Sequence, residues 1–217
     1  MNSTQVNHPY KIRAALISNA QQIANPVDEV YTVSLITIAD LEGSMILYVM
    51  RHTEAVEGSD SLQDEWRYLT EKGRRSAEKM SATIAKNGPK PRLTLTSPLT
   101  RSVQTAEIAA GKACRKNVVV ASELLLPGAG IDALVTHLKG CGDAKRVMLV
   151  GHEPQLGVLT ATLLGRPGET IPLKKGSCVA LKFDQDADDK PAAFLWYVAP
   201  GKKKITAFKR AFPGKNN

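Results

Sequence analysis

The chain has 217 residues, 43% of them apolar and 23% charged, and a formal net charge of +8. These values are ordinary for a globular protein, and they exclude a fully disordered, collagen-like or coiled-coil chain. The three cysteines, Cys114, Cys141 and Cys178, are far apart and form no C-x-x-C pair, which favours a cytoplasmic setting over a disulfide framework. No apolar run reaches the ~20 residues of a membrane span, and no secretory signal is recognisable, so we expect no membrane association.

The two ends of the chain differ from its middle. Residues 1–44 have no lasting periodicity, and we interpret them as an N-terminal extension, either an overlong start or an artificial junction before Met45. Residues 201–217 carry six basic side chains and no acidic one, and we interpret them as a basic tail. A solvated tail is the simpler explanation. The alternative is a contact for an acidic partner or for nucleic acid through counterion release.

Strands and helices alternate through residues 45–200. The predicted strands of this alternating region are short apolar runs, at 45–50, 93–96, 118–121 and 147–150. The predicted helices follow them, at 70–86, 98–112, 131–138 and 156–164, with Thr70 as a candidate N-cap. Two last strands, 177–183 and 193–198, flank a polar turn and predict a hairpin. Repeated strand–helix units predict an α/β fold, a three-layer α/β/α sandwich with a mostly parallel sheet.

Residues suited to chemistry directly follow the predicted strands. The first strand ends in Arg51 and His52, and Arg101 comes shortly after the second. Glu123 follows the third strand, and His152 follows the fourth. In sheets of this type, ligands bind beyond the carboxyl ends of the strands. We therefore expect these five side chains at one edge of the sheet.

Two arginines beside two histidines suit a phosphoryl group. A guanidinium is permanently charged, and its planar fork of donors matches phosphate oxygens. One such contact at ~4 Å is worth about 4 kcal/mol at an effective dielectric of 20. A neutral histidine in that field is a nucleophile toward phosphorus, and a second histidine can donate to an equatorial oxygen. A carboxylic acid such as Glu123 can protonate the leaving group.

Each of these residues also has a simpler explanation when taken alone. A single histidine or arginine at a strand end is usually a surface or capping residue, and Glu123 can pair with a lysine. The rival chemistry is a metal site, since His52 with Glu54, or His152 with Glu153, offers ligands. However, neither pair has the i, i+4 spacing of a helical zinc motif, and the P-C-x-x-C of zinc deaminases is missing. We therefore expect no metal.

Three segments resemble the signature blocks of the histidine phosphatase superfamily, which has the phosphoglycerate mutase-like fold. Residues 47–55 (LYVMRHTEA) resemble its R-H-G block, residues 97–107 (SPLTRSVQTAE) its second block, and residues 150–154 (VGHEP) its third. The short connections between the blocks resemble the SixA branch, the protein phosphohistidine phosphatases. Three further stretches share this resemblance, at 123–130, 171–177 and 196–200.

The resemblance implies a phosphatase without metal or cofactor, in which His52 becomes phosphorylated. It implies a phosphate pocket of four residues, Arg51, His52, Arg101 and His152. Glu123 lies near the position of the family's proton donor. Thr53 departs from the family's usual glycine beside the nucleophile, and we expect it to narrow the pocket or restrict the loop. Loop 54–63 lacks the asparagine that mutase-like members use on phosphate, which argues against a sugar-phosphate mutase.

We therefore predict a phosphatase that hydrolyses phosphohistidine on a partner protein, such as a histidine phosphotransfer domain, through a covalent phosphohistidine intermediate. One alternative is a phosphatase of small phosphomonoesters that uses the same pocket. The other, from a different class, is a non-catalytic phosphoprotein-binding module. We expect a monomer that binds neither membranes nor nucleic acid.

Overall fold

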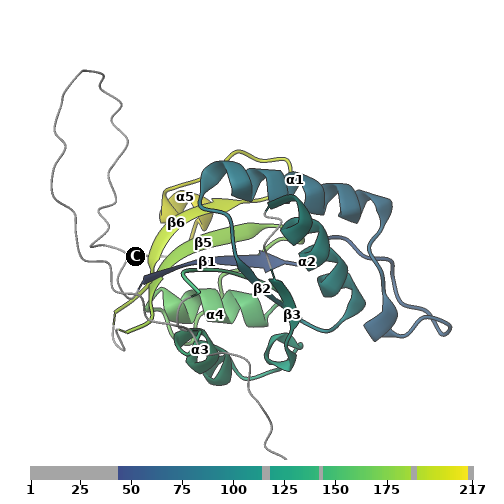
Figure 1. Cartoon of the computed structure of the whole chain (residues 1–217), viewed down its shortest axis with the longest axis horizontal. Helices are drawn as coiled ribbons and strands as arrows, with labels where there is room; N and C mark the ends of the chain where they lie inside the picture. The colour runs from purple at the N-terminus through teal and green to yellow at the C-terminus, as the bar shows by residue number, and fades with distance from the viewer. Residues whose placement is uncertain (1–43, 114–117, 142–143, 187–189, 215–217) are drawn as a thin grey trace, which may run out of the picture. The chain divides into compact units, whose positions relative to one another are not determined.

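The structure is a computed structural model, and it describes residues 44–113, 118–141, 144–186 and 190–214 (Figure 1). The predicted N-terminal extension, apart from its last residue Ser44, lies outside the described residues. None of the helices in these ranges combines the length and the apolar composition that crossing a bilayer requires.

A mixed sheet of six strands forms the middle of the described domain. The strands are β1 (Ser44–Arg51), β2 (Leu93–Thr96), β3 (Val118–Ala121), β4 (Arg146–Gly151), β5 (Cys178–Asp184) and β6 (Ala193–Val198). Their order is β3-β2-β4-β1-β5-β6, in which β1 to β4 run parallel and the hairpin β5–β6 is antiparallel. Every predicted strand is present within one residue of its expected bounds, so the predicted α/β class is confirmed.

The helices also follow the predicted order. They are α1 (Glu71–Asn87), α2 (Thr100–Ala113), α3 (Ile131–Lys139), α4 (Gln155–Leu163) and a short α5 (Phe208–Ala211). The hydroxyl of Thr70 accepts from the backbone N–H of Gly73 at 3.0 Å, which makes Thr70 the N-cap of α1. A Cβ at position 73 would overlap the carbonyl oxygen of Glu54, so the first turn of α1 lies directly against the chain that follows β1.

The two faces of the sheet are both covered, because successive side chains of a strand point to opposite faces. On β1, Leu47 and Val49 belong to a core shared with α3 and α4. Tyr48 and Met50 belong to a second core shared with α1 and α2. Figure 1 shows these two helix pairs on opposite sides of the sheet. The result is the predicted three-layer arrangement, with the carboxyl ends of β1, β2, β3 and β4 at one edge.

The segment after β6 packs against the domain instead of leaving it at residue 200. Ile205 and Tyr197 exchange two backbone hydrogen bonds of 2.9 Å. Phe212 is 5% exposed, and its ring centroid lies 4.9 Å from that of Tyr197. The side chains of the lysines at 202–204 are exposed, as expected for a basic tail. The backbone of the segment is nevertheless fixed, because its aromatic side chains pack against the domain.

Candidate active site

The register of the central strands brings the two histidines together. β1 pairs with β4 in parallel, with Arg51 opposite Gly151. The next residue on each strand is a histidine, and the backbone N–H of His52 donates to the carbonyl of Gly151 at 3.0 Å. The ring centroids of His52 and His152 lie 5.0 Å apart. This geometry confirms that two distant parts of the sequence place their imidazoles side by side.

One ring nitrogen of His52 is engaged by the backbone. Its Nδ1 lies 2.7 Å from the carbonyl oxygen of Thr53, and a carbonyl can only accept, so Nδ1 carries the proton. In the neutral ring, Nε2 then holds the lone pair. The His52 side chain is 7% exposed, so packing as well as the hydrogen bond fixes the ring. This is the tautomer in which Nε2 is nucleophilic.

His152 is held by two serine hydroxyls. Its Nε2 lies 2.9 Å from the Oγ of Ser97 and 3.2 Å from the Oγ of Ser102. Ser97 directly follows β2, and Ser102 lies in the first turn of α2. A hydroxyl that donates to Nε2 leaves the imidazole proton on Nδ1. Neutral His152 can then donate a hydrogen bond from Nδ1.

Both imidazoles are neutral at neutral pH. Burial lowers the pKa of His52 to about 4. The hydrogen bond to Thr53 opposes that shift, and the positive charges of Arg101 and Arg51 reinforce it. Burial likewise lowers the pKa of His152 to about 3, and its interaction with His52 is the next largest cause. An imidazole nitrogen that holds no proton can attack an electrophile without a separate base.

Arg51 is positioned by the loop between α4 and β5. One of its terminal nitrogens donates to the carbonyl of Leu173 at 2.8 Å. Its Nε is buried, and no group of the described chain accepts from it. The same loop is fastened at Gly176, whose N–H lies 3.1 Å from the carbonyls of both Arg51 and His52. Gly176 has φ +73°, a conformation that favours glycine.

Arg101 is buried, and its guanidinium is bonded to the loop that carries Asp64. Its two terminal nitrogens donate to the carbonyl oxygen of Asp64 at 2.6 Å and to its Oδ2 at 2.9 Å. Burial of the Asp64 carboxyl raises its pKa, but hydrogen bonds from Arg67 and Arg101 outweigh that effect and the pKa is lowered. The charge of Arg101 nevertheless acts on both histidines, which places the guanidinium at the same edge of the sheet.

Glu123 is at this edge but is not joined to the imidazoles. It begins a 3-10 turn after β3, and the preceding Ser122 donates from its N–H to the carbonyl of Thr96 at the end of β2. Its side chain is exposed, and none of the hydrogen bonds within the described part of the chain links it to His52 or His152. Its role as an acid stays a prediction.

Thr53 is fully buried and packs against α2. Its N–H donates to the Oγ1 of Thr105 at 3.2 Å, and the two hydroxyls lie 3.3 Å apart. The Thr105 hydroxyl donates in turn to the carbonyl of Arg101 at 2.7 Å. These contacts join the chain after His52 to the helix that carries Arg101, and a restricted loop stays a prediction.

Four residues that contact the site were not singled out for a role from the sequence: Asp64, Ser97, Ser102 and Leu173. Ser97 and Ser102 lie within the SPLTRSVQTAE block, whose serines carried no assigned function. Asp64 accepts from Arg101, which is 37 residues away in the sequence, and Leu173 accepts from Arg51, which is 122 residues away. No local sequence pattern predicts contacts over such separations. Among the residues that the structure describes, no three of His, Cys, Asp and Glu gather as metal ligands.

Comparison with known proteins agrees with this geometry. The family model described as the histidine phosphatase superfamily (branch 1) matches residues 47–124. An uncharacterized protein of Picosynechococcus sp. is 34% identical over 142 residues, which are 64% of this chain and 85% of that protein.

Solved structures share the fold at lower identity. The protein histidine phosphatase SixA complexed with tungstate is 23% identical with a TM-score of 0.64, and the match covers 72% of this chain and 97% of that chain. The mycobacterial glucosyl-3-phosphoglycerate phosphatase Rv2419c complexed with VO3 is 19% identical with a TM-score of 0.51, over 69% of this chain and 96% of that chain. The family match, the relative that is matched over 85% of its length and the two adjoining histidines support one conclusion: this chain belongs to the histidine phosphatase superfamily.

Proposed function

We propose that this phosphatase removes the phosphoryl group from phosphohistidine on a partner protein, with Nε2 of His52 as the nucleophile. The single observation that carries the proposal is the state of His52. Its ring is buried, neutral and protonated on Nδ1, and it lies 5.0 Å from the ring of His152. The likeness to the protein histidine phosphatase SixA supports the choice of substrate.

In the first step, Nε2 of His52 attacks phosphorus in line with the departing nitrogen. A P–N bond forms to His52, the P–N bond of the substrate breaks, and the substrate imidazole leaves with the electron pair and takes a proton. The Nε–H of Arg51 and the Nδ1–H of His152 are donors for the equatorial oxygens, on which negative charge spreads. Arg101 adds a third donor group at the same edge.

In the second step, water attacks the phosphorus on His52 and gives up a proton to solvent. A P–O bond forms, the P–N bond to His52 breaks with its electron pair returning to Nε2, and inorganic phosphate leaves. The Nδ1–H bond to the Thr53 carbonyl keeps the His52 ring in place through both steps. An imidazole is a better leaving group than an alkoxide, so phosphohistidine needs less help from an acid than a phosphate ester does. This suits a site whose only predicted acid, Glu123, is exposed and not bonded to the histidines.

The second candidate is a phosphatase of small phosphomonoesters. The likeness to the glucosyl-3-phosphoglycerate phosphatase favours it, since that protein shares the same fold. On this candidate, Glu123 protonates the leaving alkoxide, and the rate depends on that carboxyl. The two candidates therefore differ in what Glu123→Gln does to turnover.

The test is a substrate panel with purified full-length protein, with and without chelator. Phosphohistidine in a peptide should be hydrolysed much faster than any small phosphomonoester, chelator should change nothing, and Glu123→Gln should keep most of the activity. His52→Asn is the inactive control, because it removes the nucleophile. Fast turnover of a small ester together with loss of activity in Glu123→Gln would favour the second candidate. Wild-type turnover in His52→Asn would overturn the mechanism for both.

A further inference from the structure

A basic hollow lies beside the loop that bonds the backbone carbonyl of His52. Its volume is about 290 Å³, and four lysines line it together with Glu54 and Ser76: Lys72, Lys174, Lys175 and Lys202. Three separate parts of the chain contribute them. Lys72 is in the first turn of α1, Lys174 and Lys175 are in the loop before β5, and Lys202 is in the segment after β6.

The backbone connects this hollow to the nucleophile. Lys175 directly precedes Gly176, whose N–H bonds the carbonyls of Arg51 and His52. The charge of Lys175 is also one of the causes that lower the pKa of His52. Glu54, which also lines the hollow, is two residues after His52. The hollow therefore lies along the backbone on both sides of His52, because Glu54 and Lys175 line it.

The positive charge of the hollow is largely uncompensated. Glu54 is the single acidic residue among the described residues that line it. That carboxylate accepts from Lys72 at 2.7 Å and from the Thr70 hydroxyl at 3.0 Å. Lys174, Lys175 and Lys202 are exposed, and within the described ranges no carboxylate forms an ion pair with them. Uncompensated charge next to a site attracts ligands of opposite sign and speeds their association.

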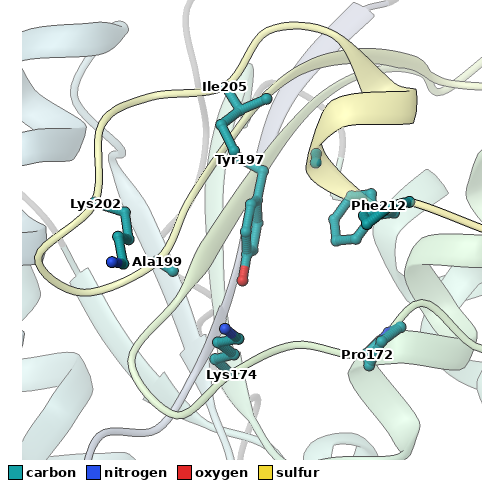
Figure 2. A pocket seen from close by; sticks show the side chains of 9 residues that line it. Pro172, Lys174, Tyr197, Ala199, Lys202, Ile205 and Phe212 are labelled. Atoms are coloured by element: carbon teal, nitrogen blue, oxygen red, sulfur yellow. The ribbon is translucent and has the colours of Figure 1, made fainter.

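An apolar hollow adjoins the basic one. Its volume is about 410 Å³, and Lys174, Ala199 and Lys202 line both. Figure 2 shows Lys202 on one side of Tyr197 and Phe212 on the other, with Lys174 below the hydroxyl end of the Tyr197 side chain. Its remaining walls are mostly apolar and include Pro172 and Ile205. A ligand that occupies both hollows therefore meets positive charge in one and an apolar surface in the other.

We propose that these adjoining hollows bind an acidic segment of the phosphoprotein substrate. Its carboxylates contact Lys174, Lys175 and Lys202, and an apolar side chain of the same segment enters the neighbouring hollow. This inference rests on the proposed function, because it names the kind of protein surface that surrounds the phosphohistidine.

A polypeptide fits this surface better than a nucleic acid does. Bases bind single-stranded sites by stacking on exposed aromatic rings, and Tyr197 and Phe212 are only 6% and 5% exposed. They form the floor and wall of a hollow that an aliphatic side chain can fill. The lysines carry flexible point charges, which suit carboxylates presented at varied angles.

The test compares two synthetic phosphohistidine peptides of equal length. One has glutamates on both sides of the phosphohistidine, and the other has glutamines there. We expect KM to be about tenfold lower for the glutamate peptide at low salt, with similar kcat, and the difference to shrink at high salt. In K174A/K202A the preference should disappear, while hydrolysis of the glutamine peptide stays at the wild-type level.

The matched control is K86A/K90A. It removes two exposed lysines near the end of α1 and the start of β2, at the opposite edge of the sheet, and should keep the full preference. A second readout does not depend on catalysis: titration with the unphosphorylated glutamate peptide should shift the NMR signals of residues 172–176 and 199–205. Equal KM for the two peptides, or a preference that persists in K174A/K202A, would overturn the docking surface and leave the phosphatase intact.

If the proposed function is wrong, the same experiments give a different result. In that case neither phosphohistidine peptide is hydrolysed, and small esters are. The NMR titration still decides the docking surface, since shifts confined to other residues would overturn it. Stronger binding of a single-stranded oligonucleotide than of the glutamate peptide, lost in K174A/K202A, would replace the acidic segment with nucleic acid as the occupant.

Discussion

Burial of two neutral histidines makes the stability of this domain depend on pH in a defined window. Unfolded His52 binds a proton below its ordinary pKa of 6.5, whereas folded His52 binds one only below about 4. The stabilising contribution is therefore complete above pH 6.5 and is lost as the pH falls toward 4. His152 acts in the same direction, with a pKa lowered to about 3.

The size of the effect follows from the pKa of His52. Each factor of ten in proton affinity is worth about 1.4 kcal/mol, so the free energy of unfolding should fall by roughly 3 kcal/mol between pH 7 and pH 4 through His52 alone. Carboxylates also titrate in this range. The difference between wild type and His52→Gln isolates the histidine, because both proteins carry the same carboxylates.

The assay is urea unfolding followed by tryptophan fluorescence, which reports on the buried Trp196, at several pH values from 7 to 4. We expect the His52→Gln protein to lose about 3 kcal/mol less than wild type over this range. His137→Gln removes an exposed histidine on α3 and controls for the loss of a histidine as such. If wild type and His52→Gln show the same pH dependence, or if NMR titrates His52 near 6.5, the buried neutral nucleophile is refuted.

Three further changes test other parts of the account. Arg101→Ala should lower kcat by on the order of 10²–10³, by analogy with the loss of one oxyanion donor. Arg101→Lys should recover only part of this loss, because lysine lacks the planar fork of donors. A loss below tenfold in Arg101→Ala would show that Arg101 does not contact the reacting phosphoryl group. Gly73→Ala should destabilise the domain by about 1–3 kcal/mol in urea unfolding, since its methyl group overlaps the carbonyl of Glu54; an unchanged unfolding midpoint would contradict that contact. Phe212→Ala should cost about 3 kcal/mol of stability; if it is as stable as a Lys209→Ala control, the segment after β6 does not pack as described.

Much of the fold was predictable because short apolar runs mark its strands. The run 147–150 lies between Lys145-Arg146 and Gly151, and it became β4 within one residue at each end. Since parallel strands end at one edge, the position of His52 and His152 after two such runs was enough to predict their meeting. The periodicity of the sequence does not give the register of β1 and β4. The structure shows that Arg51 lies opposite Gly151, which sets the two following histidines side by side.

The rest depended on contacts between distant residues. Asp64 reaches Arg101 across 37 residues, and nothing in the local sequence distinguishes it from other loop carboxylates. Likewise, α5 is a single turn among basic residues. The basic composition of the segment suggested a solvated tail, although two aromatic side chains, Phe208 and Phe212, hold it in place. Tertiary packing of those rings, and not helix propensity, decides the structure of this segment.

The most direct test of the central claim is to isolate the phosphorylated enzyme. The protein is mixed with excess phosphohistidine peptide, denatured at alkaline pH to preserve P–N bonds, digested, and mapped by mass spectrometry. We expect a phosphoryl group on His52 that is absent in His52→Asn and that disappears at a rate matching turnover. A phosphoryl group on another residue, or full turnover with no phosphorylated enzyme at any time point, would contradict it.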